Sequence, residues 1–300
     1  MIGITATEFT SQPSAAARQR MLSCRGEPLF LAAWRRVLMM HFEVDARSLQ
    51  RDVPFPLDLY HGRAFISLVA FTMEGMRPHA GGQWTARLFK PIATHDFLNV
   101  RTYVVCDGEP GIHFLAEWLT NRLAVMLGPA TFSLPYRYGR ISYNFDQPRG
   151  LLQGRVADAS NSPDWRLESR QNPQAGKPAL QPRLAFRGNL TASARFQPAQ
   201  VDSLTEWLIE RYTAFNSAGG RHRYFRVWHP PWPQCAVEAK LDDQTLLTKN
   251  WSWFHESKLV GANYSPGFDE VWMGRPRGVR QKSSFGYWHR ILRWSPAFRR

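Results

Sequence analysis

The chemistry that this sequence can support begins with an arginine and a tyrosine two positions apart. Arg101 and Tyr103 lie in an extended segment, residues 99–104, and residues two apart on a strand point to the same face. A guanidinium that faces an enclosed pocket holds a carboxylate through two parallel hydrogen bonds, and a neighbouring hydroxyl donates another. The pair predicts a clamp for a small organic anion. The alternative is a structural role, with Arg101 in an ion pair or bonded to loop carbonyls.

Three further residues are candidates for the same pocket. Glu117 ends the next strand and is the nearest counter-charge for Arg101. His229, among aromatic residues and prolines, is either a base near neutral pH or a hydrogen-bonded structural residue. Tyr136 either lines the pocket mouth or caps the core. We therefore predict a ligand site made of Arg101, Tyr103, Glu117, Tyr136 and His229, with no metal and no cofactor.

Several signatures of other chemistry are absent from the sequence. It contains no GxGxxG, GxxxxGK[ST] or GxSxG motif, which argues against dinucleotide, nucleoside triphosphate and nucleophile-elbow sites. The nine histidines form neither HxH nor HExxH, so a zinc site has no support. Cys24, Cys106 and Cys235 are too far apart for a CxxC motif, and we expect reduced thiols.

The elements that must position these residues are mostly short strands. A strand is expected at residues 34–42, and two hairpins at 57–60 with 64–73 and at 97–106 with 112–117. Further strands are expected at residues 140–145, 151–157, 165–170, 221–228, 234–241 and 270–273, and a surface loop at 171–183. This pattern predicts a β-rich α+β domain with a curved antiparallel sheet or a closed β-barrel.

Few helices are expected. Short ones are predicted at residues 46–51, after Asp45, and at 120–127, where Gly128-Pro129 would end the helix. The longest is predicted at residues 204–215, where Ser203 and Glu206 form a capping box before an apolar stripe. This is the one long helix expected to pack on the sheet.

Charge and hydrophobic periodicity divide the chain into three parts. Residues 1–27 lack a hydrophobic period and are expected to be a flexible arm, residues 28–274 a single β domain, and residues 275–300 a basic aromatic tail. The net charge is +14, and the tail holds eight cations and no acid. No apolar run approaches the roughly 20 residues of a membrane-spanning helix, and no secretory signal is evident, so a cytoplasmic protein is expected.

Six short motifs occur in an order that resembles a known family. They are residues 99–104 (NVRTYV), 108–111 (GEPG), 132–136 (FSLPY), 206–212, 227–232 (VWHPPW) and 264–266 (YSP). Together they resemble the YqjF-like family, domain of unknown function 2071, in the acetoacetate decarboxylase-like superfamily, over about residues 34–279. The resemblance implies a curved antiparallel β-structure around a cone-shaped pocket, with the helix that contains Trp207 packed outside. It implies no particular reaction.

Two departures bear on chemistry. Where the family has an acidic residue before the NVRTYV motif, this chain has Phe97, and Asp96 stands one position earlier, which reverses its face on a strand. The decarboxylases of the superfamily use a Schiff-base lysine with a lowered pKa. This chain has only six lysines, none of them between residues 91 and 176, so Schiff-base decarboxylation is not expected.

Two functions therefore remain open. The first is a pocket that binds a small, anionic organic ligand, with Arg101 and Tyr103 positioning it. The second is a non-enzymatic adaptor whose basic aromatic tail docks on an anionic membrane or on nucleic acid. Whether a reaction follows binding, and the oligomeric state, are not indicated by the sequence.

Overall fold

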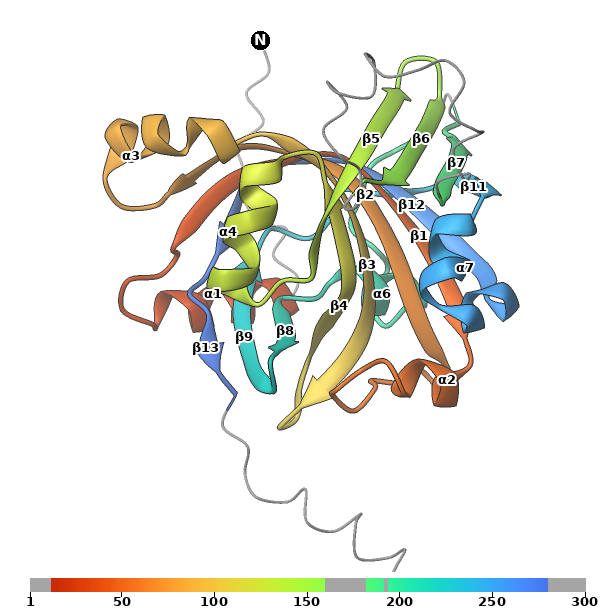
Figure 1. Cartoon of the computed structure of the whole chain (residues 1–300), viewed down its shortest axis with the longest axis horizontal. Helices are drawn as coiled ribbons and strands as arrows, with labels where there is room; N and C mark the ends of the chain where they lie inside the picture. Colours follow the sequence, from red (N-terminus) through yellow and green to blue (C-terminus); the bar gives the residue numbers. More distant parts are fainter. Residues whose placement is uncertain (1–11, 160–181, 192–193, 280–300) are drawn as a thin grey trace, which may run out of the picture.

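The computed structural model describes residues 12–159, 182–191 and 194–279. Thirteen strands form a sheet with the main order β11-β7-β6-β5-β4-β3-β2-β1-β12-β9-β13 (Figure 1). The strands are β1 (Phe30–Val44), β2 (Ala64–Pro78), β3 (His95–Cys106), β4 (Glu109–Leu119), β5 (Tyr136–Asp146), β6 (Leu151–Asp158), β7 (Arg183–Asn189), β8 (Thr213–Ala218), β9 (Arg221–Trp228), β10 (Cys235–Ala236), β11 (Glu238–Asp243), β12 (Lys258–Met273) and β13 (Arg277–Gly278). The helices are α1 (Gln12–Leu22), α2 (Ala46–Gln50), α3 (Gly82–Phe89), α4 (Arg122–Phe132), α6 (Leu204–Ile209) and α7 (Thr245–Asn250), with 3-10 turns η1 (Lys90–Ile92) and η2 (Ser252–Glu256).

A short strand closes part of this sheet into a ring. β8 pairs with β4 in parallel, where Ala214 faces Ile112, and with β9 in antiparallel, where Ala214 faces Phe225. Because β4, β3, β2, β1, β12 and β9 pair in series, β8 joins the two ends of that series. The ring confirms the predicted β-rich α+β class. The pairs β4–β5 and β4–β8 are parallel, whereas only antiparallel pairs were expected.

Alternate residues of the ring strands point to two different hydrophobic clusters. On β1, Leu38 and Met40 belong to an outer cluster, whereas Val37 and Met39 belong to an inner one. All seven ring strands contribute buried side chains to the inner cluster, which therefore lies inside the ring. Burial on both faces fits the uninterrupted apolar runs Val37–Met40 in β1 and Leu68–Phe71 in β2.

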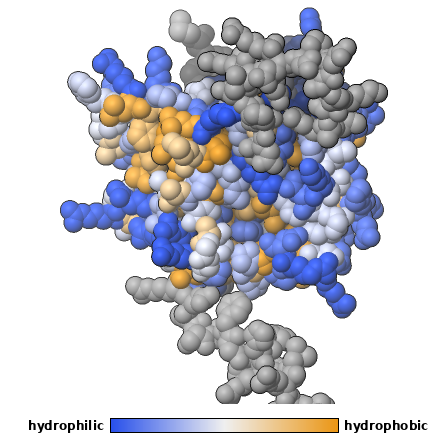
Figure 2. Space-filling view, viewed as in Figure 1, coloured by the Kyte–Doolittle hydropathy of each residue, from blue (hydrophilic) through white to orange (hydrophobic). Residues whose placement is uncertain are grey.

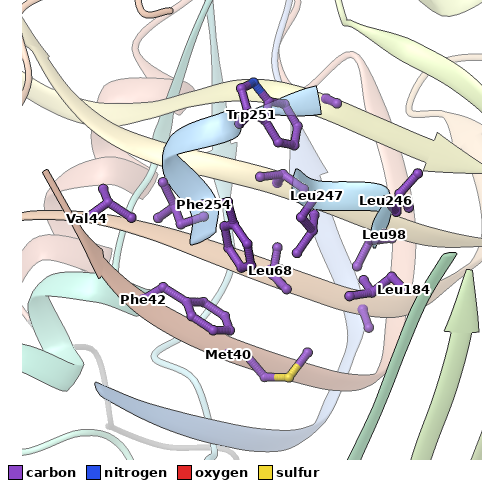
Figure 3. Close-up of a cluster of buried hydrophobic side chains, with 14 of the residues drawn as sticks. Met40, Phe42, Val44, Leu68, Leu98, Leu184, Leu246, Leu247, Trp251 and Phe254 are labelled. Atoms are coloured by element: carbon purple, nitrogen blue, oxygen red, sulfur yellow. The ribbon is translucent and has the colours of Figure 1, made fainter. Parts of the chain in front are cut away.

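The outer cluster joins the ring to α7, η2 and the β5–β6–β7–β11 extension of the sheet. Figure 3 shows side chains of α7 and its continuation lying over β1, β2 and β3. The residues labelled there are Met40, Phe42, Val44, Leu68, Leu98, Leu184, Leu246, Leu247, Trp251 and Phe254. All of these side chains are apolar and buried, so this face of the sheet serves stability.

The helix predicted at residues 204–215 is shorter than expected. Half of its capping box forms, because the Glu206 amide donates to Ser203 Oγ at 3.1 Å, but the Glu206 carboxylate accepts from the Asp202 amide instead of that of Ser203, and α6 ends at Ile209. The following residues form β8, because hydrogen bonding to β4 on one side and β9 on the other outweighs local helix propensity. Leu208 and Ile209 are buried in the inner cluster, whereas the family resemblance implied a helix packed outside.

Other boundaries agree or shift by a few residues. The strands expected at residues 34–42, 64–73, 97–106, 112–117, 140–145, 151–157, 221–228 and 270–273 are present. The strand expected at 234–241 is divided into β10, which pairs with β12, and β11, which pairs with β7. Residues 57–60 form only isolated bridges, although the tight turn at His61-Gly62 exists. α4 runs through Pro129, and Ser133 in a left-handed conformation ends it. β7 begins at Arg183, the last residue of the expected loop; the strand predicted at 165–170 lies outside the described residues.

The expected N-terminal arm needs correction over residues 12–27. Residues 12–22 form α1, whose Ala17 and Met21 are buried. Ser14 Oγ donates to the carbonyl of His229 at 2.8 Å, which fixes the helix against the end of β9. Ala17 and Met21 are four residues apart, so they lie on the same face of the helix. In the described part of the chain, no helix is long and apolar enough to cross a membrane.

Candidate functional site

A cavity of about 270 Å³ lies among the residues of the inner cluster. Most of its wall is made of phenylalanine, valine, methionine, leucine and tryptophan side chains from β1–β4, β9, α3 and α4. The polar or ionisable side chains in the wall are those of His95, Asn99, Arg101, Glu117, Thr131, Tyr136, Arg211, Thr213 and His229. Four of the five predicted site residues therefore line one cavity, and Tyr103 is the exception.

Strand β3 supplies three of the polar groups by simple alternation. His95, Asn99 and Arg101 line the cavity together with Phe97, while Leu98 and the other intervening residues face the outer side. The sequence left open which face of its strand Arg101 occupies; in the structure Arg101 faces the cavity and is 7% exposed. The polar positions follow the period of two that the strand imposes.

A β-bulge brings Glu117 to the same cavity. On β4, Ile112 and Phe114 line the cavity, so strict alternation would place Ala116 there next. The register moves from Val100↔Ala116 to Arg101↔Phe114, which leaves Leu115 as an extra residue. This insertion reverses the alternation, so Ala116 packs in the outer cluster and Glu117 points inward.

The ion pair expected between Arg101 and Glu117 does not form. Glu117 is opposite Asn99, whereas Arg101 is opposite Phe114 beyond the bulge. Arg101 instead donates from Nη2 to the carbonyl of Leu208 at 3.5 Å, and its buried Nε has no partner. The contact that Arg101 makes is therefore the alternative one, a hydrogen bond to a backbone carbonyl.

Tyr103 lies behind the cavity wall rather than in it. Its hydroxyl donates to the carbonyl of Leu208 at 2.9 Å and is 2.5 Å from Ser67 Oγ. Ser67 in turn contacts His41 Nδ1 at 2.6 Å, and His41 Nε2 is 3.1 Å from Asn263 Oδ1. Tyr103 and Arg101 thus share one carbonyl, so the tyrosine supports the position of the arginine instead of contacting a ligand.

Arg211 is a cavity residue that the sequence did not reveal. It follows α6, and its Nη1 donates to Asp58 Oδ2 at 2.7 Å while Nε donates to the carbonyl of Trp207 at 2.7 Å. The guanidinium lies over the Trp207 ring at 4.2 Å, and Nη2 is buried without a partner. Burial, and then the charge of Arg101, lower the pKa of Arg211 despite the bond to Asp58. The helix predicted at residues 204–215 would have contained Arg211, whereas α6 ends at Ile209 and Arg211 lies beyond it.

Glu117 is a buried carboxyl in an apolar setting. Its Oε2 has no hydrogen-bond partner, and burial raises its pKa from 4.5 to about 8. Strand register places Tyr136 beside Glu117, and burial together with this carboxyl raises the pKa of Tyr136 well above its usual value. At neutral pH Glu117 is therefore a protonated group able to donate a hydrogen bond.

Two histidines in the wall are neutral near pH 7. His229 Nδ1 donates to the carbonyl of Pro230 at 2.7 Å, and burial lowers its pKa to about 4. Its ring also stacks on Phe268 at a centroid distance of 5.1 Å, so the structural role fits His229 better than that of a base. Burial likewise lowers the pKa of His95 to about 4, and neither of its ring nitrogens has a partner.

Unpartnered polar atoms concentrate in this cavity. Buried side-chain atoms without a hydrogen bond occur in six of its lining residues, namely Trp34, His95, Asn99, Arg101, Glu117 and Arg211. Leaving such groups unpaired costs free energy, so a cluster of them is expected where a ligand supplies the missing partners. No lysine of the described residues lines the cavity; Lys177 and Lys282 lie outside that part of the chain.

Known proteins resemble this chain in sequence and in fold. Residues 31–269 match the DUF2071 family, described as "Uncharacterized conserved protein". The protein named "Uncharacterized protein YqjF" of Bacillus subtilis (strain 168) is 30% identical over 219 residues, which cover 71% of this chain and 78% of that protein.

Solved structures share the fold at low sequence identity. They include acetoacetate decarboxylase from Legionella pneumophila subsp. pneumophila, with a TM-score of 0.57, 10% identity, and coverage of 84% of this chain and 87% of that one. An acetoacetate decarboxylase-like enzyme from Sphingomonas wittichii RW1 has a TM-score of 0.53 and 13% identity, with coverage of 84% and 93%. The enduracididine biosynthesis enzyme MppR complexed with pyruvate has a TM-score of 0.51 and 14% identity, with coverage of 84% and 90%. The chain belongs to the DUF2071 family and has the acetoacetate decarboxylase-like fold.

Proposed function

We propose that this protein binds an apolar organic acid in the cavity inside the ring, with the carboxylate held by Arg101 and Arg211. The observation that carries the proposal is the pair of buried guanidinium groups that line one cavity and each retain an unpartnered N–H. A guanidinium satisfies a carboxylate through parallel hydrogen bonds, which matches these free donors. A solved structure with the same fold holds pyruvate, a small carboxylate.

The local charge balance favours an anion. Asp58 neutralises Arg211, but no carboxylate of the described residues forms an ion pair with Arg101. Burial raises the pKa of Glu210 to about 7 even though the nearby charge of Arg101 acts in the opposite direction, and the Glu210 oxygens already accept bonds from the Trp232 amide and the Tyr212 hydroxyl. One positive charge therefore remains available to a ligand, in a low-dielectric site where it acts strongly.

A second polar group on the ligand would be held by Asn99 and Glu117, which line the same cavity. Asn99 Oδ1 is an unpaired acceptor opposite Glu117, whose protonated form is a donor. A hydroxyl or amide on the ligand would satisfy both groups at once. The apolar side chains between these groups and the cavity mouth fit a hydrocarbon or aromatic body.

We further propose that the ligand is held without a covalent bond. A Schiff base needs a lysine beside the substrate carbonyl, and the described cavity wall contains none. Treatment with borohydride and a β-keto acid is expected to leave the protein mass unchanged. An adduct on any lysine would contradict this part of the proposal.

The binding proposal is tested with matched acids and alcohols. Isothermal titration with octanoate and phenylacetate should give saturable binding, whereas 1-octanol and phenylethanol should bind at least tenfold more weakly. Arg101→Lys keeps the charge but loses the planar fork, and it should weaken acid binding by about 1.5–3 kcal/mol. Arg187→Lys, on an exposed arginine paired with Asp242, is the control. Equal binding of acids and alcohols, or equal losses in the two variants, would refute an anion clamp.

The tail remains a second candidate, because eight cations without an acid occupy residues 275–300. Arg277 donates to Glu27 Oε1 at 2.8 Å, so the first residues of that segment are joined to the domain, whereas residues 280–300 lie outside the described ranges. A chain ending at Val279 should lose retention on heparin if the tail docks on a polyanion. Unchanged retention would exclude the tail as the docking element.

A further inference from the structure

Helices α3 and α4 carry apolar side chains that nothing in the described structure covers. Trp84 and Leu88 are 77% and 75% exposed, and Met126 is 67% exposed. With Leu123 and Leu127 they form what we call the helical patch. Figure 2 shows a broad hydrophobic area over the region where Figure 1 places α3 and α4. Contiguous exposed apolar surface of this kind marks a site of interaction.

The helical patch is continuous with the mouth of the cavity. Leu127 is 43% exposed and also lines the cavity, as do Phe89 at the end of α3 and Phe132 at the end of α4. Phe30 lies between these two rings, at centroid distances of 5.5 Å from Phe89 and 6.1 Å from Phe132. An apolar molecule that leaves the cavity through this wall therefore arrives at the helical patch.

The charges beside the patch have one sign. Arg87, Lys90 and Arg122 are exposed on α3, η1 and α4, and these three elements contain no acidic residue. None of the three cations forms an ion pair with a carboxylate of the described residues; Arg122 lies over the Tyr138 ring at 4.3 Å. Exposed tryptophan and aliphatic residues flanked by unpaired cations are suited to the interface of an anionic lipid bilayer.

We infer that α3 and α4 dock on an anionic membrane surface, and that the cavity ligand is an amphiphilic acid exchanged with that membrane. The docking part stands on the helical patch and its cations alone. The ligand part rests on the proposed function, because it places the acid group on Arg101 and Arg211 and the hydrocarbon toward the mouth. Such a path lets a water-insoluble chain enter the cavity without crossing solvent.

A second copy of the chain fits this surface less well than a membrane. A twofold interface would bring the patch against itself, so the three cations of each copy would face one another with no acid on either pair of helices. An anionic bilayer instead supplies the opposite charge together with an apolar layer for Trp84 and Leu88.

The docking is tested by flotation of the full-length protein with vesicles. Binding to phosphatidylglycerol vesicles should exceed binding to phosphatidylcholine vesicles at least tenfold and should weaken as salt is raised. Trp84→Gln combined with Leu88→Gln should reduce flotation at least tenfold. Leu151→Gln combined with Val201→Gln, at exposed apolar positions outside α3 and α4, is the matched control and should leave flotation unchanged.

A charge variant and a truncation decide between sources of binding. Arg87→Gln with Lys90→Gln should remove the preference for phosphatidylglycerol, whereas a chain ending at Val279 should retain it. Loss of flotation in the truncated chain alone would assign membrane binding to the tail and overturn the inference. A stable dimer of the native protein in ultracentrifugation would also overturn the inference, if Trp84→Gln combined with Leu88→Gln converts that dimer to a monomer.

The failure of docking and the failure of the proposed function give different results. Arg101→Lys should leave flotation unchanged while it weakens octanoate binding. Octanoate binding without flotation would overturn the docking surface alone, and flotation without any acid binding would overturn the ligand part and the proposed function together.

Discussion

The two faces of the ring strands come from alternate residues of the same segments, but they differ in how well their buried polar groups are hydrogen-bonded. The outer cluster packs under α7 and η2, and buried His113, whose ring lies 5.5 Å from that of Phe55 in this cluster, hydrogen-bonds the carbonyl of Phe215. The inner cluster, formed by the alternate residues of the same strands, borders a cavity whose wall also holds buried arginine, glutamate, asparagine and histidine side chains, several with unpartnered atoms. One face therefore holds the strands together while the other carries groups that destabilise the empty protein. This division lets the chain tolerate an unsatisfied polar cavity in its centre.

The largest expected difference between the two faces comes from removing a phenylalanine from each. Phe42 is 4% exposed and packs in the outer cluster 5.2 Å from Phe254, so Phe42→Ala should cost about 3–5 kcal/mol. Phe71 borders the cavity, and Phe71→Ala should cost roughly half as much because part of its ring already lacks neighbours. Urea unfolding of both variants measures this difference, and equal losses would show that the cavity is closed in solution.

Glycine substitutions sharpen the same contrast at smaller magnitude. A Cβ on Gly154 would lie 2.1 Å from the Phe186 ring in the outer cluster, so Gly154→Ala should cost about 1–3 kcal/mol. A Cβ on Gly128 would lie 2.2 Å from the Tyr136 ring, which borders the cavity and can move into it. Gly128→Ala should therefore leave the free energy of unfolding within about 1 kcal/mol of the parent, since alanine also favours the helix, and should weaken octanoate binding. Thermal unfolding and titration calorimetry check both expectations.

Replacing Arg101 tests whether the inner face is kept for function at the expense of stability. Arg101→Met removes a buried charge that forms no ion pair with a carboxylate of the described residues, so the ligand-free variant should be about 1–2 kcal/mol more stable than the parent. Acid binding should be lost. Arg187→Met, on the outside, should change stability by less than about 0.5 kcal/mol. A destabilised Arg101→Met would indicate that the guanidinium is a structural element.

Glu117 should give a pH-dependent signature of the cavity. The folded protein keeps this proton up to a pKa of about 8, whereas an unfolded chain releases it near 4.5, so Glu117 lowers stability progressively as the pH rises between these values. Glu117→Gln cannot ionise, so its melting temperature relative to the parent should rise by at least about 2–4 °C between pH 5 and pH 8.5. The exposed Glu256→Gln should show no such trend.

Local periodicity predicted the parts of the site that follow regular strands. The period of two placed Arg101 and Tyr103 on one face of β3, whereas which face points into the ring depends on how the strands close and is seen only in the structure. The predicted pairing of Arg101 with Glu117 was wrong because an extra residue in β4, Leu115, changes the register between β3 and β4. A bulge depends on how two strands meet in space, and one strand's sequence does not contain that information.

The remaining errors come from contacts between distant segments. Arg211 lies where α6 gives way to β8, and this boundary is fixed by pairing with β4, about a hundred positions earlier in the chain. Helix α1 is held by Met21 and by the bond from Ser14 to His229, at the other end of the sequence. Composition alone indicated a flexible arm there, because the stabilising partner is remote.

The pairing of β1 with β12 has a consequence for synthesis of the chain. Phe30 is opposite Met273, so the second edge of β1 receives its hydrogen bonds only from a strand that is synthesised about 240 residues later. Until then a long, apolar strand offers an open edge to any neighbouring nascent chain. Contacts between such distant positions also slow folding, since the intervening loop must be ordered first. The ring is therefore expected to form late and to depend on chaperones while β1 waits for β12.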